Sequence, residues 1–141
     1  KKTRARSNSQ KEFFKVLGER IEFGKLAEKT ALAFLKARGY KVRLCNYRTK
    51  FSEIDIIAED KGTICFIEVK ARHSLKFGSP LDAVSVKKQR QIAKSAIFYL
   101  KANNLLEQLC RFDVLTLLYT DNLPEISLIK DAFELSASFT V

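Results

Sequence analysis

Two apolar runs joined by a short polar turn constrain the fold of this chain more than any other feature. The first run is 54–58, Ile-Asp-Ile-Ile-Ala, and the second is 64–70, Ile-Cys-Phe-Ile-Glu-Val-Lys. The residues between them, 59–62, read Glu-Asp-Lys-Gly, which is typical of a hairpin turn, so the sequence predicts two antiparallel strands. Both strands carry charged side chains, and burying a charge without a partner is costly. Groups near these strands must therefore compensate the charges.

Three of these charged side chains are expected to meet on one face of the hairpin. Side chains alternate along a strand, so Glu68 and Lys70 share a face. The register of a tight turn then brings Asp55 opposite or diagonal to Glu68. Two carboxylates and a lysine suit metal-dependent phosphodiester cleavage, because Mg²⁺ takes oxygen ligands and leaves positions for water and a substrate phosphate. The alternative is a partly buried ion pair between Lys70 and one carboxylate, with the other carboxylate at an exposed strand end.

The composition predicts one basic, soluble domain. The chain has 141 residues, of which 46% are hydrophobic, enough for a core of its own. Its net charge of +10 favours a polyanionic partner, with nucleic acid first and an anionic membrane surface second. No apolar run approaches the roughly 20 residues of a membrane span, and no signal peptide is visible, so we expect a cytoplasmic protein. Three cysteines without a CxxC pair argue against a disulfide framework and are expected to be core thiols.

The remaining segments predict helices around a mixed sheet. Residues 1–22 are expected to form a basic arm and a short lead-in helix, and residues 23–141 a single domain. The apolar spacing predicts a helix over 23–38 that Gly39 ends, with Glu28 on the edge of its buried face. The other expected elements are strand 40–47, the hairpin, loop 71–83, helix 85–101, a buried strand 111–119 reached by a right-handed parallel crossover, and edge strand 125–130.

The helix over 85–101 carries a basic stripe. Its members are Lys87, Arg90, Lys94 and Lys101. Several of them lie in the N-terminal half of the helix, where the macrodipole disfavours positive charge, so phosphate binding explains them better than stability does. The alternative is a solvated helix face.

Two further residues each have a functional and a structural interpretation. Asp113 is a candidate for the carboxylate cluster or a partner of Arg111 or Lys70. His73 is expected on a surface loop, with a phosphate contact as the alternative.

Several motifs in order resemble the YraN-like uncharacterised family, UPF0102, which is grouped with the restriction-endonuclease-like and Holliday junction resolvase-like superfamily. They cover roughly residues 23–118. These motifs are Gly24, Glu28, Asn46-Tyr47-Arg48, Ser52-Glu53-Ile54-Asp55-Ile56-Ile57-Ala58, Phe66-Ile67-Glu68-Val69-Lys70-Ala71-Arg72, Phe77-Gly78, Lys88-Gln89 and Arg111-Phe112-Asp113-Val114.

The resemblance implies an α/β fold with a mixed sheet, flanking helices and a PD-(D/E)xK-type site. Asp55 and Glu68 would be the metal-binding carboxylates and Lys70 the catalytic lysine. Glu28 would supplement the metal site through water, and Gln89 matches a glutamine often found beside such sites. Two residues depart from the pattern. Ile54 stands in place of the motif proline, and Ser52 in place of a glycine.

The sequence and the resemblance together predict a Mg²⁺- or Mn²⁺-dependent endonuclease acting on DNA, plausibly branched or otherwise structured. Arg72, Lys87, Arg90 and Lys94 are expected to hold the nucleic-acid backbone without reading its sequence. Junction-cutting relatives act as dimers, so a homodimer is compatible with this activity. The alternative is a nucleic-acid-binding protein on the same fold that does not cut.

Overall fold

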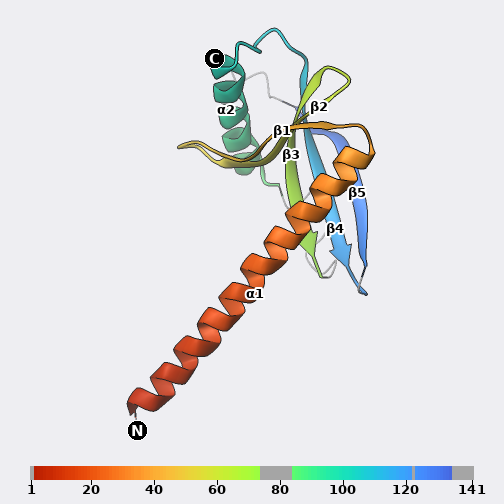
Figure 1. Ribbon diagram of the computed structural model, residues 1–141. Coiled ribbons are helices and arrows are strands. Elements are labelled where there is room, and N and C mark those ends of the chain that lie inside the picture. Colours follow the sequence, from red (N-terminus) through yellow and green to blue (C-terminus); the bar gives the residue numbers. More distant parts are fainter. Residues whose placement is uncertain (1, 74–83, 122, 135–141) are drawn as a thin grey trace.

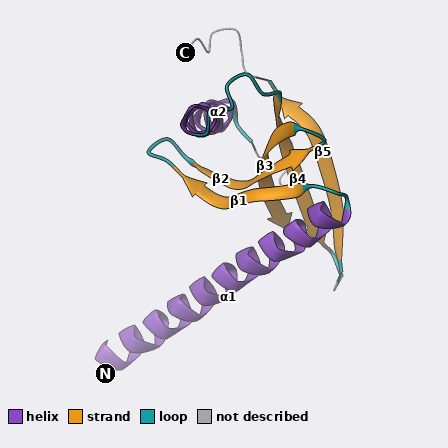
Figure 2. Ribbon diagram, turned by 45° about the horizontal axis from the view of Figure 1, so that its top comes forward, coloured by secondary structure: helices purple, strands orange, loops and turns teal. Residues whose placement is uncertain are grey.

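A computed structural model describes residues 2–73, 84–121 and 123–134, with side chains from residue 8 onward. The elements are α1 (Lys2–Ala37), β1 (Lys41–Arg48), β2 (Glu53–Asp60), β3 (Thr63–Arg72), α2 (Val86–Ala102), β4 (Cys110–Tyr119) and β5 (Pro124–Phe133). The five strands form one sheet in the order β1-β2-β3-β4-β5. The two helices lie on opposite faces of this sheet (Figures 1 and 2). The predicted α/β fold with a mixed, helix-flanked sheet is confirmed.

The predicted hairpin is formed by β2 and β3, which pair antiparallel. Its turn has two central residues with positive φ, Lys61 at 49° and Gly62 at 84°. Positive φ at both positions gives a turn whose twist matches that of the flanking strands. β3 then pairs with β4 in parallel through α2, so the predicted crossover is also confirmed.

The core has two parts, one on each face of the sheet. On one face α2 packs against the sheet through the side chains that its periodicity predicts: Ile92, Ala93, Ala96, Tyr99 and Leu100. On the other face Ala27, Ala31 and Leu35 of α1 are almost fully buried. Two of these three are alanines, and small side chains allow a helix to approach a sheet closely. Each face of β3 is therefore covered by a helix, and charged side chains on β3 need local partners.

Helix α1 begins much earlier than expected. The predicted arm, lead-in helix and helix over 23–38 are one helix, Lys2–Ala37, and Gly39 with a φ of 87° follows its end. The segment before residue 23 contains no proline and only one glycine, so nothing in its backbone chemistry interrupts the helix. The N-terminal part of α1 projects away from the sheet (Figure 1). The sequence predicted helix in the lead-in segment and over 23–38, but neither the continuity of the two nor the helical conformation of the basic arm.

The structure also bears on the thiols and on membrane crossing. The three cysteines are free; Cys65 is buried, and Cys45 and Cys110 are half-buried. Burial raises the pKa of each of these thiols, that of Cys65 to about 12, which suits the core role expected from the sequence. Among the described residues, neither helix has a stretch apolar and long enough to cross a membrane.

Two leucines of α1 test how it is anchored. Leu35 is 0% exposed and Leu26 is 55% exposed. We expect Leu35→Ala to lower the free energy of unfolding by about 2–5 kcal/mol, because it leaves a cavity under the helix. Leu26→Ala removes the same atoms from an exposed position and should change the free energy of unfolding by less than about 0.5 kcal/mol. Urea unfolding of both variants measures the difference, and equal losses would contradict this packing.

Candidate active site

The candidate site lies where the pairing of β2 with β3 stops. The last paired residues are Ile56 and Ile67, and the same register continued by one residue sets Asp55 opposite Glu68, as predicted from the turn. At this point the Oδ2 atom of Asp55 accepts a hydrogen bond of 2.8 Å from the backbone N–H of Val69. A side chain thus satisfies a donor beyond the end of the backbone ladder. We call Asp55 and Glu68 the acid pair.

The strands also change the face that they present at this point. Ile54 and Ile56 are two residues apart and would share a face in a regular strand. Instead, Ile54 packs in the core part beneath α2, and Ile56 packs in the part beneath α1. On the neighbouring strand, Asn46 has a φ of 54°, and its Nδ2 donates a hydrogen bond of 2.7 Å to Oε1 of Glu28 on α1. Asp55 therefore lies at a transition between the two faces.

Two lysines from different elements neutralise Glu68. The Glu68 side chain is only 7% exposed, and its Oε1 lies 2.7 Å from Nζ of Lys88 on α2 and 3.4 Å from Nζ of Lys70 on β3. The ion pair considered from the sequence, between Lys70 and a carboxylate, is thus present. The other carboxylate, Asp55, is partly buried and hydrogen-bonded rather than placed at an exposed strand end.

Burial and neighbouring charges shift the pKa of Asp55 and of the two lysines. Burial and then the negative charge of Glu68 raise the pKa of Asp55 to about 7, although Val69 N–H and the two lysines oppose this. Burial also lowers the pKa of Lys70, with Glu68 opposing and Lys88 adding to the effect. For Lys88, burial acts downward, but contacts with Glu68 outweigh it and the pKa is raised. Asp55 thus carries the least compensated charge of the group.

The donor set suits a hard divalent cation. Mg²⁺ and Mn²⁺ prefer carboxylate oxygens and are commonly held by one or two of them with water and phosphate. Burial and the charge of Glu68 raise the pKa of Asp55, and a bound divalent cation would stabilise its ionised form. Within the described ranges, no three His, Cys, Asp or Glu side chains gather closely enough to hold one ion. The acid pair alone is therefore the candidate set of direct protein ligands.

A cavity of about 720 Å³ lies between Asp55, one member of the acid pair, and α1. Asp55, Val69 and Glu28 line it. The resemblance brought Glu28 and Asp55 to one site, and the structure places them on one cavity, with Glu28 held by Asn46. A role of Glu28 through water stays a prediction. The side chain of Gln89 turns back to the start of α2, where its Nε2 donates to the carbonyl oxygen of Val84 at 3.0 Å, so its role also stays a prediction.

The sequence reasoning missed Lys88 as a site residue. Lys88 occurs only as part of the family motif, whereas the site roles are predicted for its neighbours Lys87 and Gln89. The available signal was the position of Lys88 in the first turn of a helix that follows the hairpin, where a cation needs an acidic partner. Helical spacing alone did not show which of two adjacent lysines faces the sheet.

The departure at Ser52 has a structural explanation. Its hydroxyl lies 2.7 Å from Oγ of Ser95 and donates to the carbonyl oxygen of Gln91 at 3.1 Å. Ser95 is fully buried on α2 and also lies 2.7 Å from Oγ1 of Thr49. These hydroxyl hydrogen bonds hold the β1–β2 connection against α2. The connection directly precedes β2, the strand that carries Asp55.

Asp113 belongs to a separate network beneath α1. It is fully buried and accepts hydrogen bonds from Nε of Arg111 at 3.0 and 3.1 Å and from the backbone N–H of Asp131 at 2.9 Å. Of its two predicted roles, pairing with Arg111 is therefore the one observed. His73 is exposed, as predicted, and its ring stacks on Phe23 with centroids 4.4 Å apart.

The residues predicted to hold nucleic acid are exposed. They are Arg72, Lys87, Arg90 and Lys94. Lys50 lies beside Lys94 and extends this basic surface. The Nζ atoms of Lys94 and Lys50 lie 5.4 and 5.2 Å from the ring centroid of Phe51. The predicted loop over 71–83, including the Phe77-Gly78 motif, lies outside the described residues from position 74 onward.

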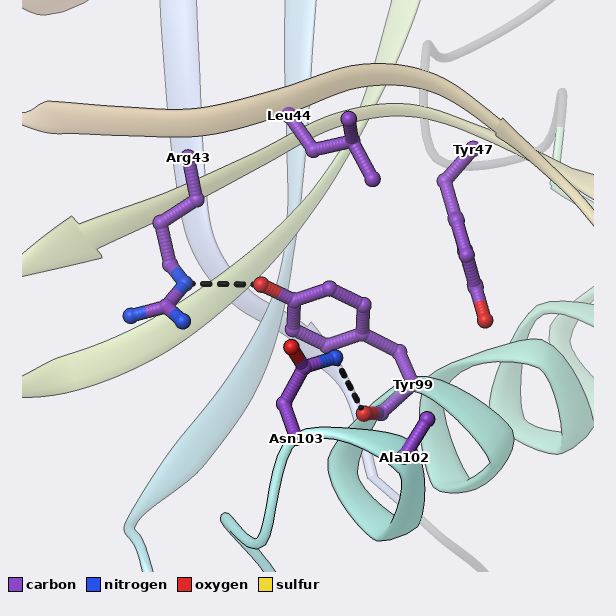
Figure 3. Close-up of a pocket in the computed structure, with 6 residues that line it drawn as sticks. All are labelled: Arg43, Leu44, Tyr47, Tyr99, Ala102 and Asn103. Carbon is purple, nitrogen blue, oxygen red and sulfur yellow. Dashed lines mark hydrogen bonds between the residues drawn. The ribbon is translucent and has the colours of Figure 1, made fainter.

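A second cavity, of about 460 Å³, lies between β1 and the C-terminal end of α2 (Figure 3). In it Arg43 Nε donates to the hydroxyl of Tyr99 at 2.7 Å, and Asn103 Nδ2 donates to the Tyr99 carbonyl oxygen at 2.9 Å (Figure 3). Its lining contains no carboxylate. The cavity at Asp55 is therefore the better candidate for a metal.

The raised pKa of Asp55 predicts how stability depends on pH. Because its folded pKa, about 7, exceeds the ordinary value of 3.8, the metal-free protein should lose stability as the pH rises from about 4 to 7. Asp55→Asn keeps an acceptor for Val69 N–H and removes the charge. We expect it to raise the melting temperature by a few degrees at pH 8 and to change it little at pH 4. Thermal unfolding in EDTA measures the melting temperature at both pH values. A lower melting temperature of Asp55→Asn than of wild type at pH 8 would contradict the raised pKa of Asp55.

Comparison with known proteins identifies the family. The model of "Uncharacterised protein family UPF0102" matches residues 27–117. A UPF0102 protein of Syntrophus aciditrophicus is 46% identical over 118 residues, which are 84% of this chain and 93% of that protein. Those of Desulfosudis oleivorans and Myxococcus xanthus are 42% and 37% identical, over 84% and 82% of this chain and 95% and 92% of those proteins. The chain belongs to the UPF0102 family, as its motifs predicted.

Proposed function

We propose that this protein is a metal-dependent endonuclease that hydrolyses phosphodiester bonds in DNA, with branched or structured molecules as its expected substrates. The observation that carries the proposal is the acid pair with Lys70 at the end of the β2–β3 ladder. Two carboxylates lie there in a partly buried setting that raises the pKa of Asp55 to about 7. A partly buried carboxylate with a raised pKa that lines a cavity, as Asp55 does, is typical of functional sites rather than of structural ion pairs.

Each residue has a role that its position supports. Asp55 and Glu68 would hold Mg²⁺ or Mn²⁺, which when bound lowers the pKa of water and neutralises charge on a phosphate. Lys70 is partly buried, lies 3.4 Å from Glu68, and can donate hydrogen bonds to a phosphate oxygen whose charge increases in the transition state. The hydrogen bond from Val69 holds the Asp55 carboxylate in place. Low solvent exposure strengthens each of these interactions.

Activity can be tested directly on labelled DNA. The substrates are linear duplex, flapped, single-stranded and four-way-junction molecules, each with Mg²⁺, Mn²⁺ or EDTA. We expect cutting with metal, and a loss of at least about a hundredfold in Asp55→Asn and Lys70→Met, because each removes a group required in the transition state. Lys61→Met, in the exposed hairpin turn, lowers the net charge by the same amount as Lys70→Met and should cut like wild type.

The outcomes separate the two candidate functions. Equal cutting by wild type and Asp55→Asn would assign the activity to a contaminant and contradict the site. Salt-sensitive DNA binding without cutting under any metal condition would instead support the non-cleaving nucleic-acid-binding protein. The predicted cytoplasmic location and homodimer are parts of the proposal that fractionation and sedimentation would test.

The basic surface predicts a salt dependence. We expect Lys87→Met and Arg90→Met each to reduce the slope of log affinity against log salt concentration by about 0.9, the value for one lost phosphate contact. The affinity loss should be similar for DNAs of different sequence, because backbone contacts do not read bases. Fluorescence anisotropy in EDTA at several salt concentrations measures the slope. An unchanged slope would show that these side chains do not contact phosphates.

A further inference from the structure

Lys88 compensates Glu68 more closely than Lys70 does. Its Nζ lies 2.7 Å from Glu68 Oε1, against 3.4 Å for Lys70. A separation of 2.7 Å is that of a short charge-assisted hydrogen bond. Since Glu68 is 7% exposed, water contributes little to its compensation, and the two ammonium groups provide most of the positive charge described around it.

A divalent ion bound to the acid pair would compete with this contact. The acid pair and the two lysines carry two charges of each sign, so the cluster is balanced when all four groups are ionised. An added divalent cation would leave an excess of two positive charges in a partly buried place, where like charges repel strongly. Moving one ammonium group away reduces that excess. The ion and one lysine are therefore alternatives as neighbours of Glu68.

Lys88 is better placed to move than Lys70. The Lys88 side chain is 38% exposed, whereas that of Lys70 is 17% exposed. The backbone of Lys88 is fixed, because its N–H donates to Oγ of Ser85, the N-cap of α2, so only the side chain needs to swing. A cation in the first turn of a helix also opposes the macrodipole, which leaves Glu68 as the interaction that holds it inward.

We propose that Lys88 is a built-in counter-ion of the metal site, which holds Glu68 in the metal-free protein and leaves it when a divalent ion binds. The inference rests on the proposed metal site and adds that the affinity of this site is set by competition with Lys88. Lys88 acts here through Glu68 and is a positioning residue. In the metal-free protein it keeps a buried carboxylate paired, which avoids the cost of an isolated charge.

The test measures Mn²⁺ binding to the metal-free protein without DNA, by isothermal titration calorimetry. We expect Lys88→Met to bind Mn²⁺ about tenfold more tightly than wild type, because the competing charge-assisted hydrogen bond is gone. Lys61→Met, in the exposed hairpin turn, has the same net charge as Lys88→Met and should change affinity by less than about twofold. Lys88→Arg keeps a cation and should stay close to wild type.

Each result decides the inference. If Lys88→Met binds Mn²⁺ no more tightly than Lys61→Met, the competition is absent. If wild type binds Mn²⁺, Asp55→Asn abolishes binding, and the two lysine variants are alike, the inference fails while the proposed metal site stands. If no variant binds, both fail. Lys88→Gln, which keeps a hydrogen-bond donor for Glu68, replaces Lys88→Met if circular dichroism shows that the latter does not fold.

Discussion

The hydrogen bond from Val69 N–H to the Asp55 carboxylate is the contact on which the site depends. It lies just beyond the last paired residues of β2 and β3, so it fixes the side chain of Asp55 relative to Glu68 on the neighbouring strand. A carboxylate that pairs with the backbone of the next strand cannot turn to solvent without leaving a donor unsatisfied. The same contact therefore explains why Asp55 stays close to Glu68, although the hydrogen bond itself acts against the rise in pKa that burial and the charge of Glu68 cause.

Buried charges gather in two groups among the described residues, and these groups differ in how well their charges are compensated. Asp113 is fully buried, yet Arg111 and a backbone N–H satisfy it, and Arg111 also reaches Asp60 at 3.0 Å. This arrangement ties β2, β4 and β5 together and is typical of a structural network. Around the acid pair, by contrast, two carboxylates repel each other and one lysine is half in solvent. That contrast, rather than burial alone, separates a candidate active site from a structural ion pair.

The sequence predicted those parts of the molecule that depend on local chemistry. The turn over 59–62 specified the hairpin register and with it the meeting of Asp55 and Glu68, and the apolar spacing of α2 identified its buried face. The full length of α1 was missed because the side chains of residues 8–17 lie exposed, and apolar periodicity detects only packed faces. Lys88 was missed because choosing between adjacent lysines requires the angle of α2 above the sheet, which only tertiary packing determines.

The irregular backbone at the sheet edges has a consequence for how the protein behaves at high concentration. β1 and β5 are the two edge strands, and an unbroken edge strand can pair with a strand of another molecule. Pairing of β1 with β2 shifts register between Val42 and Leu44, and positive φ angles occur at Asn46 in β1 and Asp131 in β5. A backbone that turns in this way cannot present a continuous row of donors and acceptors. The turn at Asn46, whose side chain holds Glu28, should therefore also protect the sheet from aggregating edge to edge.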